Sequence, residues 1–387
     1  MAEPSADPTR SVELSGPDLT EAELAAVLAV LRTPRLSLGP KLPAFETCVA
    51  AYVGCRHGVA VSSGTSALHL IVRALGLGEG DEVITTPFSF IASANCLLYE
   101  RAVPVFADID PQTLNLDPSL VAAALTPRTR AILAVDVFGR PADWDALRDI
   151  AARRGLALIE DSCEALGARY RKRDGAWAMA GSLADAGAFA FYPNKQITTG
   201  EGGLIVTDRD DIARLCRSMR NQGRDEGDGW LSHARLGYNY RLSDINCALG
   251  LAQMARLGEI LAARRRVADW YRQALAGLDG VEAPAETPGV EISWFVYVVR
   301  LRRCPGREQL HRIIQALRAR GVGCSNYFPP IHLQPFYREA FGCREGDFPI
   351  TEAISAQSLA LPFHNRLRQE EVEYVVTALK QCLEEVG

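Results

Sequence analysis

A lysine in a polar turn is the residue of this chain whose chemistry is most specific. Lys195 lies in GAFAFYPNKQITTGEGGLIVT (187–207), between two apolar runs. The chain has only four lysines against dozens of arginines, which makes the choice of lysine here informative. Arginine stays charged, whereas the amine of lysine can lose its proton and attack a carbonyl. The turn therefore suggests a lysine that forms a Schiff base, with a turn lysine of no chemical role as the alternative.

Two further stretches place polar groups where a strand is expected to end. In VSSGTSALHL (61–70), a strand gives way to a helix, and the free N–H groups of a helix start can bind phosphate. Gly64, Thr65 and Ser66 would form that cup. In LALIEDSCEALGA (156–168), the strand ends at Asp161, whose carboxylate can keep a ring nitrogen protonated. Taken alone, each stretch is explained equally well by ordinary helix capping.

An aromatic residue and a cationic pair complete the set. Phe90, in TTPFSFIASAN (85–95), can stack on a planar ring or belong to the core. Asn239 and Arg241, in the loop LGYNYRLSD (236–244), suit a phosphate, or else a solvated loop with a structural arginine. Together these residues supply a phosphate cup, a stacking aromatic, a ring-nitrogen carboxylate and a Schiff-base lysine. Pyridoxal 5'-phosphate (PLP) needs these groups, because the protein binds and orients it while the cofactor acts as electron sink.

The elements that must position these residues alternate along the chain. Short apolar, β-branched runs predict strands at 58–62, 82–86, 103–108, 131–137, 156–160, 187–192 and 203–207. Amphipathic stretches between them predict helices at 65–75, 90–100, 118–125 and 141–155. This alternation indicates a mostly parallel seven-stranded sheet covered on both faces. Ligands of such sheets bind beyond the carboxyl ends of the strands.

The flanking segments predict a second, smaller α/β unit. Thr20 and Glu23 form a capping-box signature before the first helix, and another helix is expected at 44–54. Helical periodicity over 245–275 suits a connection between two domains. Beyond it we expect a strand at 293–301, a helix at 308–320, a strand near 322–327, and helices at 350–358 and 369–384. The expected division is 1–245 for the N-terminal segment and large domain, 246–277 for a linking helix, and 278–387 for the small C-terminal domain.

Composition narrows the class of protein. The 387 residues are 48% hydrophobic and 23% charged, which is typical of a globular protein. A net charge of −5 argues against nucleic-acid or membrane-surface binding, so local arginines would have to bind any polyanionic ligand. The ten cysteines form no CxxC pair, and the six histidines show no zinc-ligand spacing with them. With a polar N-terminus and no apolar run of membrane-spanning length, we expect a cytoplasmic protein with reduced thiols and no metal.

Several motifs together resemble the DegT/DnrJ/EryC1/StrS aminotransferase family. They run in order from about residue 35 to the C-terminus: VSSGTSALHL, GDEVITTPFSF, VPVFADIDPQTLNLD, IEDSCEALGA, FYPNKQITTGEGG, GYNYRLSDINCALGLAQ and SLALPFHN. The resemblance implies a fold-type-I PLP aminotransferase that works as a homodimer. Its implied substrate is a nucleotide-linked keto-sugar, with glutamate or glutamine as amino donor.

The resemblance also implies roles for the residues that match its motifs. Lys195 would carry the Schiff base and move the proton between cofactor and substrate, Asp161 would hold the pyridinium nitrogen, and Phe90 would stack on the ring. The implied phosphate ligands are Gly64, Thr65 and Ser66, with Asn239 and Arg241 contributed by the neighbouring subunit.

Two positions depart from the family pattern. The family usually has a serine after the first Phe of the lysine strand, where its hydroxyl contacts the phosphate, and this chain has Ala190. Three residues after Asp161, many members carry Gln or His over the ring, and this chain has Glu164. A carboxylate there can hydrogen-bond the cofactor's phenolic oxygen if it is protonated or bridged by water. Glu164 is therefore counted among the cofactor-binding residues, with its role open.

Three other functions compete with transamination. The family's dehydratase branch uses the same cofactor but has histidine at the lysine position, so Lys195 argues against it. A non-catalytic regulatory protein on the same scaffold would not need the pair of Lys195 and Asp161. A Rossmann dehydrogenase is disfavoured because GLGEGDE (76–82) lacks GxGxxG and precedes a strand. Tyr327, His332 and the loop 32–43 are candidate substrate contacts, or else domain-interface residues.

Overall fold

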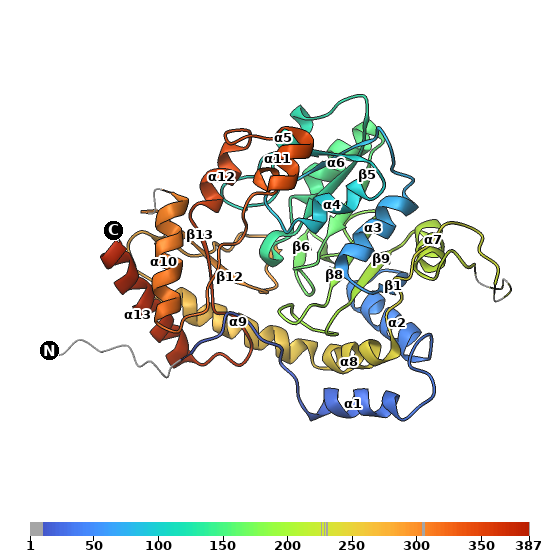
Figure 1. The fold of residues 1–387 in the computed structure, drawn as a ribbon, viewed down its shortest axis with the longest axis horizontal. Coiled ribbons are helices and arrows are strands. Elements are labelled where there is room, and N and C mark those ends of the chain that lie inside the picture. Colours follow the sequence, from blue (N-terminus) through green and yellow to red (C-terminus); the bar gives the residue numbers. More distant parts are fainter. Residues whose placement is uncertain (1–10, 226, 228, 230, 304–305, 387) are drawn as a thin grey trace.

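A seven-stranded sheet organises the larger part of the molecule (Figure 1). The computed structural model describes residues 11–225, 227, 229, 231–303 and 306–386. The sheet has the order β1-β9-β8-β5-β4-β2-β3, and only β9 runs against its neighbours. The predicted mostly parallel sheet is therefore confirmed. Its strands are β1 (His57–Val61), β2 (Glu82–Thr85), β3 (Val103–Phe106), β4 (Thr129–Val135), β5 (Ala157–Asp161), β8 (Ala186–Ala190) and β9 (Gly203–Thr207).

Alternating side chains bury both faces of this sheet. In β4, Ala131, Leu133 and Val135 join the core beneath α3 (Gly64–Ala74), α4 (Ala92–Leu98) and α7 (Asp210–Arg220). Ile132 and Ala134 point the other way, toward α6 (Trp144–Arg154). Successive side chains of a strand face opposite sides, so a continuous apolar run is what a doubly covered sheet requires. On that second face, α2 (Lys41–Val53) and α8 (Asp244–Ala255) cover the end of the sheet at β1 and β9.

Helix caps fix where the helices nearest the site begin. The Ser63 side chain accepts a hydrogen bond from the Ser66 N–H at the start of α3. The predicted capping box of Thr20 and Glu23 is present at α1 (Glu21–Leu31). A side-chain acceptor satisfies one of the orphan N–H groups of the first turn and so sets the helix boundary.

A second core is built from the C-terminal third. The three-stranded sheet β10 (Val281–Glu282), β12 (Tyr297–Leu301) and β13 (Ser358–Leu361) packs with α10 (Arg307–Ala319) and α13 (Gln369–Val386). Figure 1 shows this part at one end of α9 (Leu257–Ala274), with α8 running beneath the large sheet. The remaining elements are α5 (Pro118–Ala123), β6 (Arg169–Arg171), β7 (Trp177–Met179), β11 (Val290–Glu291), α11 (Pro335–Phe341), α12 (Pro349–Ser355) and the 3-10 turns Val137–Gly139 and Ile331–Leu333. None of the helices in the described part of the chain is long and apolar enough to cross a membrane.

Three expectations about local structure are corrected. The helical stretch 245–275 is broken at Arg256, whose guanidinium reaches Glu23 (2.9 Å) and Asp18 (3.2 Å). The strand predicted near 322–327 is wrong, because this segment makes only isolated bridges, from Val322 and Ser325. The helix predicted at 350–358 ends at Ser355, since the residues after it form β13 beside β12.

Candidate active site

A cavity of about 530 Å³ lies beyond the carboxyl ends of the central strands. Its walls come from seven parts of the chain: the starts of α3 and α4, the ends of β4 and β5, the segment between β8 and β9, the segment before β12, and residues 327–328. The lining is Ser63, Gly64, Thr65, Leu68, Ser89, Phe90, Ala92, Ser93, Val135, Asp161, Cys163, Glu164, Ala190, Tyr192, Asn194, Lys195, Glu201, Gly202, Phe295, Tyr327 and Phe328. Most of the predicted site residues therefore meet in one place.

The Lys195 amine points into this cavity beside a buried carboxylate. Its Nζ lies 3.5 Å from Oε1 of Glu164 and 4.1 Å from the centre of the Phe295 ring. The other oxygen of Glu164 accepts the Phe138 N–H at 2.9 Å. Burial raises the pKa of Glu164, and the nearby lysine charge opposes that rise. The lysine amine therefore has a buried carboxyl group as its charged neighbour in the cavity.

A buried arginine holds the turn that carries the lysine. The Arg264 guanidinium donates to the carbonyl of Lys195 at 2.7 Å and to that of Phe295 at 3.1 Å. Burial lowers the pKa of Arg264 to about 10. The planar fork of arginine suits two carbonyls at once. Arg264, from α9, therefore positions the lysine turn against β12.

The Asp161 carboxylate is fixed at the end of β5. Its Oδ2 accepts the Ser93 hydroxyl at 2.7 Å, and its Oδ1 accepts the Cys163 N–H at 3.1 Å. Asp161 is only 4% exposed, yet it lines the cavity. A carboxylate oxygen can accept more than one hydrogen bond, so Asp161 at the cavity wall can also accept one from a protonated ring nitrogen.

Two further carboxyl groups, those of Asp136 and Glu160, lie buried at the ends of β4 and β5. Ser162 donates its hydroxyl to Oδ2 of Asp136 at 2.7 Å, and its Oγ lies 3.0 Å from Oε1 of Glu160. Burial raises the pKa of Asp136 to about 6 and that of Glu160 well above its ordinary value. Two like charges so close in the core cannot both ionise cheaply, so the pair retains a proton.

The start of α3 forms a tight cup with the end of β8. A Cβ added at Gly64 would lie 2.7 Å from Cβ of Ala190 and 2.8 Å from Sγ of Cys163. The N–H groups of Gly64 and Thr65 belong to the first helical turn, where no acceptor inside the helix exists. The close approach and the free donors fit a phosphate group.

Two aromatic side chains border the opening of the cavity. Phe90 is 61% exposed, so it is not a core residue, and its ring is available for stacking. Tyr327 stacks on Phe328 with ring centres 5.0 Å apart, and burial raises the pKa of its hydroxyl. Tyr327 therefore stays a candidate substrate contact.

Two other predicted contacts do not line the cavity. Ser66 is buried, and its hydroxyl lies 2.9 Å from that of Ser63 and 3.1 Å from that of Ser62. Its N–H is also taken by the Ser63 cap, so this backbone donor is not free for a ligand. His332 is fully buried, 2.9 Å from Glu352, and burial lowers its pKa. His332 therefore does not line this cavity, and its expected substrate contact stays a prediction.

Asn239 and Arg241 lie outside the cavity of their own chain. Asn239 is exposed, and its backbone forms a bridge with Asn221. Arg241 pairs its backbone with Val61 and donates from its side chain to Oδ1 of Asn221 at 3.1 Å. In the loop 32–43, the N–H groups of Gly39 and Lys41 are bound by Asp244, and that loop also lies outside the cavity.

Sequence reasoning missed three residues that hold the site together. Ser93 binds Asp161, Phe295 lies against the lysine amine, and Arg264 fixes the lysine turn. Only Ser93 had a local signal, since it follows Phe90 by three residues in the same predicted helix. The other two come from distant segments and are found only in three dimensions.

Comparison with known proteins identifies the family of this chain. Residues 17–380 match the model of the DegT/DnrJ/EryC1/StrS aminotransferase family. GDP-perosamine synthase of Caulobacter vibrioides is 40% identical over 377 residues, covering 96% of this chain and 98% of that protein.

Solved structures of similar fold include aminotransferases of the same kind. DesV of S. venezuelae has a TM-score of 0.85 and 37% identity, with 93% of both chains covered. The PLP form of the putative sugar aminotransferase Spr1654 from Streptococcus pneumoniae has a TM-score of 0.92 and 28% identity, covering 98% of this chain and all of that one. The chain is a member of the DegT/DnrJ/EryC1/StrS aminotransferase family and a PLP-dependent aminotransferase.

Proposed function

We propose that this protein transfers an amino group from glutamate or glutamine to a nucleotide-linked keto-sugar, giving an amino sugar. The observation that carries the proposal is the lysine amine in a cavity that also holds Asp161 and the cup at Gly64. The similarity to GDP-perosamine synthase and to sugar aminotransferases supports a sugar as amino acceptor.

The residues of this chain divide the work with the cofactor. PLP supplies an electron sink for the carbon that carries the transferred amino group. Lys195 would bind the cofactor covalently and then move a proton at its amine, with Glu164 3.5 Å away as its partner. Asp161 would keep the ring nitrogen protonated, and Phe90 would stack on the ring.

The charge of the cavity supports a site shared between two subunits. Lys195 is the only cation among the described lining residues, whereas Asp161, Glu164 and Glu201 are acids. A phosphate adds about 1.5 to 2 negative charges. Such a site needs a further cation, and Arg241 of a second copy would supply it. We therefore propose a homodimer in which Asn239 and Arg241 of one subunit reach the phosphate of the other.

A substrate screen tests the reaction. Glutamate or glutamine should remove the visible absorbance of the PLP-loaded protein as the pyridoxamine form appears. One member of a panel of nucleotide-linked 3-keto and 4-keto sugars should restore it. A panel in which no keto-sugar restores absorbance, although the amino donor removes it, would contradict the sugar substrate. Loss of oxygen from the sugar without gain of nitrogen would instead favour the dehydratase reaction.

Mixed dimers test the shared site. A Lys195→Ala chain and an Arg241→Ala chain should each be inactive alone. After mixing and subunit exchange, one intact site forms per heterodimer, so part of the activity should return. Exchange verified by mass with no recovered activity would refute the contribution of Arg241 from the partner.

A further inference from the structure

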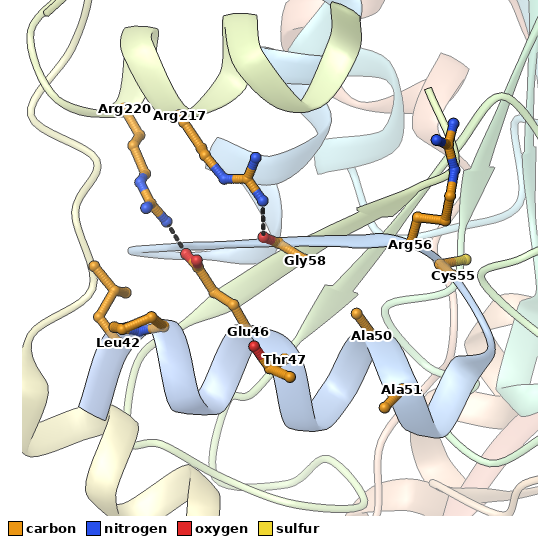
Figure 2. Close-up of a pocket in the computed structure, with 11 residues that line it drawn as sticks. Leu42, Glu46, Thr47, Ala50, Ala51, Cys55, Arg56, Gly58, Arg217 and Arg220 are labelled. Atoms are coloured by element: carbon orange, nitrogen blue, oxygen red, sulfur yellow. Dashed lines mark hydrogen bonds and ion pairs between the residues drawn. The ribbon is translucent and has the colours of Figure 1, made fainter. Parts of the chain in front are cut away.

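Two adjoining cavities beside α7 carry an unusual amount of positive charge. One, of about 450 Å³, lies between α2, β1 and α7, and Figure 2 shows Arg217 and Arg220 reaching into it from α7. The other, of about 540 Å³, lies at the end of α7 and reaches Leu38. The two share Arg217 and Arg220, and together we call them the arginine hollow. Its charged lining residues are Glu46, Arg56, Arg214, Arg217, Arg220, Arg224 and Asp225.

The acids of the hollow are already satisfied. Glu46 forms a buried ion pair with Arg220 and also accepts the Ala60 N–H at 2.9 Å. Figure 2 shows Arg220 turned toward Glu46. Arg220 also donates to the Ala60 carbonyl at 2.7 Å, so it is a fixed part of the wall. Asp225 is paired with Arg235. Neither carboxylate forms an ion pair with Arg214 or Arg217.

Within the described ranges, Arg214 and Arg217 have no acidic partner at ion-pair distance, although the charge of Arg214 helps to lower the pKa of Asp225. The side chain of Arg217 makes only one long hydrogen bond in these ranges, to the Gly58 carbonyl at 3.4 Å (Figure 2). Arg214 is exposed and Arg217 is half-buried. Both line the second cavity. Two available guanidinium groups in one cavity are suited to bidentate binding of phosphate oxygens, in a chain whose net charge is −5.

We propose that the arginine hollow binds a phosphate or diphosphate group through Arg214 and Arg217. The hollow shares no lining residue with the cofactor cavity of its own chain. Asn221 also lines it, and the Asn221 side chain accepts the bond from Arg241. Two sources of the anion fit this position. One is the diphosphate of the nucleotide-linked substrate, which rests on the proposed function, and the other is a separate phosphorylated metabolite.

Calorimetric titration of the PLP-loaded protein with inorganic pyrophosphate tests the site. We expect one pyrophosphate per chain, with an affinity that falls as salt is raised. Removal of one charge-assisted hydrogen bond should weaken binding by roughly tenfold, so Arg214→Ala/Arg217→Ala should bind at least tenfold more weakly. Arg153→Ala/Arg154→Ala is the matched control. It removes two exposed arginines from the last turn of α6, also an 11-residue helix, and should bind like the wild type.

The outcomes separate clearly. Absence of pyrophosphate binding in the wild type, or equal weakening in the control, overturns the proposal. A change in the mass of the assembly without weaker binding also overturns it, since the arginines would then serve an interface. Arg214→Glu, a single change at an exposed residue, repeats the test if the double variant does not load PLP.

The source of the anion is resolved by nucleoside diphosphates. If they compete with pyrophosphate and the double variant raises KM for the substrate, the anion is the substrate's diphosphate. If nucleoside diphosphates bind the wild type and the double variant equally, the anion of the arginine hollow belongs to a separate metabolite. Either result supports the anion site. The titration contains no amino donor, so its failure is distinct from failure of the transamination assay.

Discussion

Replacing Ala190 with serine restores a hydroxyl at the phosphate cup. Ala190 ends β8 and lines the cavity, and its Cβ lies 2.7 Å from the position that a Cβ on Gly64 would take. A hydroxyl on this carbon would therefore sit beside the free N–H groups at the start of α3. If that helix start binds the cofactor's phosphate, Ala190→Ser adds one charge-assisted donor.

The size of the effect follows from the kind of bond. A hydrogen bond to a charged group contributes about 1.5–3 kcal/mol. Since about 1.4 kcal/mol is tenfold in an equilibrium constant, the Kd of PLP should fall by about tenfold or more. Ala190 is half-buried at the cavity wall, so the new hydroxyl costs little desolvation.

The assay is a titration of the apo-protein with PLP, followed by absorbance. Ala190→Val is the control, because it adds bulk at the same place without a donor and should show no gain in affinity. Unchanged or weaker PLP binding by a correctly folded Ala190→Ser protein would refute the placement of the phosphate at this cup.

Two further changes test the packing and the charges under the site. Gly64→Ala should lower the midpoint of thermal unfolding by several degrees and weaken PLP binding, because overpacking against Ala190 and Cys163 costs about 1–3 kcal/mol. An unfolding midpoint and PLP affinity equal to wild type would contradict this. Asp136→Asn tests the buried acid pair, since the pKa of Asp136 is raised from 3.8 to about 6. Because this carboxyl holds its proton more tightly in the folded protein, its contribution to the free energy of unfolding is fully present below about pH 4. That contribution is lost as the pH rises through 6. Asparagine does not titrate, so the variant does not lose this contribution. Its free energy of unfolding relative to wild type should therefore rise by up to about 3 kcal/mol between pH 4 and pH 8, at 1.36 kcal/mol for each unit of the pKa shift. Denaturant unfolding at both pH values measures it, and a pH-independent difference would count against a retained proton.

The parts of the site that sequence reasoning reached are those set by local rules. A continuous apolar strand followed by a polar residue places Asp161 and the cup at Gly64 at the same edge of a parallel sheet. The lysine turn between two strands is recognisable in the same way. Lys195, Asp161 and Gly64 therefore meet as expected.

The other features of the structure depend on contacts between segments far apart in the sequence, which no local sequence pattern predicts. Arg264 lies 69 residues from the Lys195 carbonyl that it binds, and nothing in its own helix signals this role. Arg256, at the helix break, likewise forms ion pairs with Asp18 and Glu23, which lie far away in the sequence. His332, expected as a substrate contact or a domain-interface residue, is buried and lies 2.9 Å from Glu352.

Covalent labelling tests the central claim most directly. The PLP-loaded protein would be reduced with borohydride, digested, and analysed by mass spectrometry. The chain has only four lysines, Lys41, Lys172, Lys195 and Lys380, so the label can be assigned without ambiguity. We expect one pyridoxyl group per chain, on Lys195 in the peptide spanning 187–207, and none in the Lys195→Ala protein. A label on another lysine, or no label on a protein that has taken up PLP, would contradict the account.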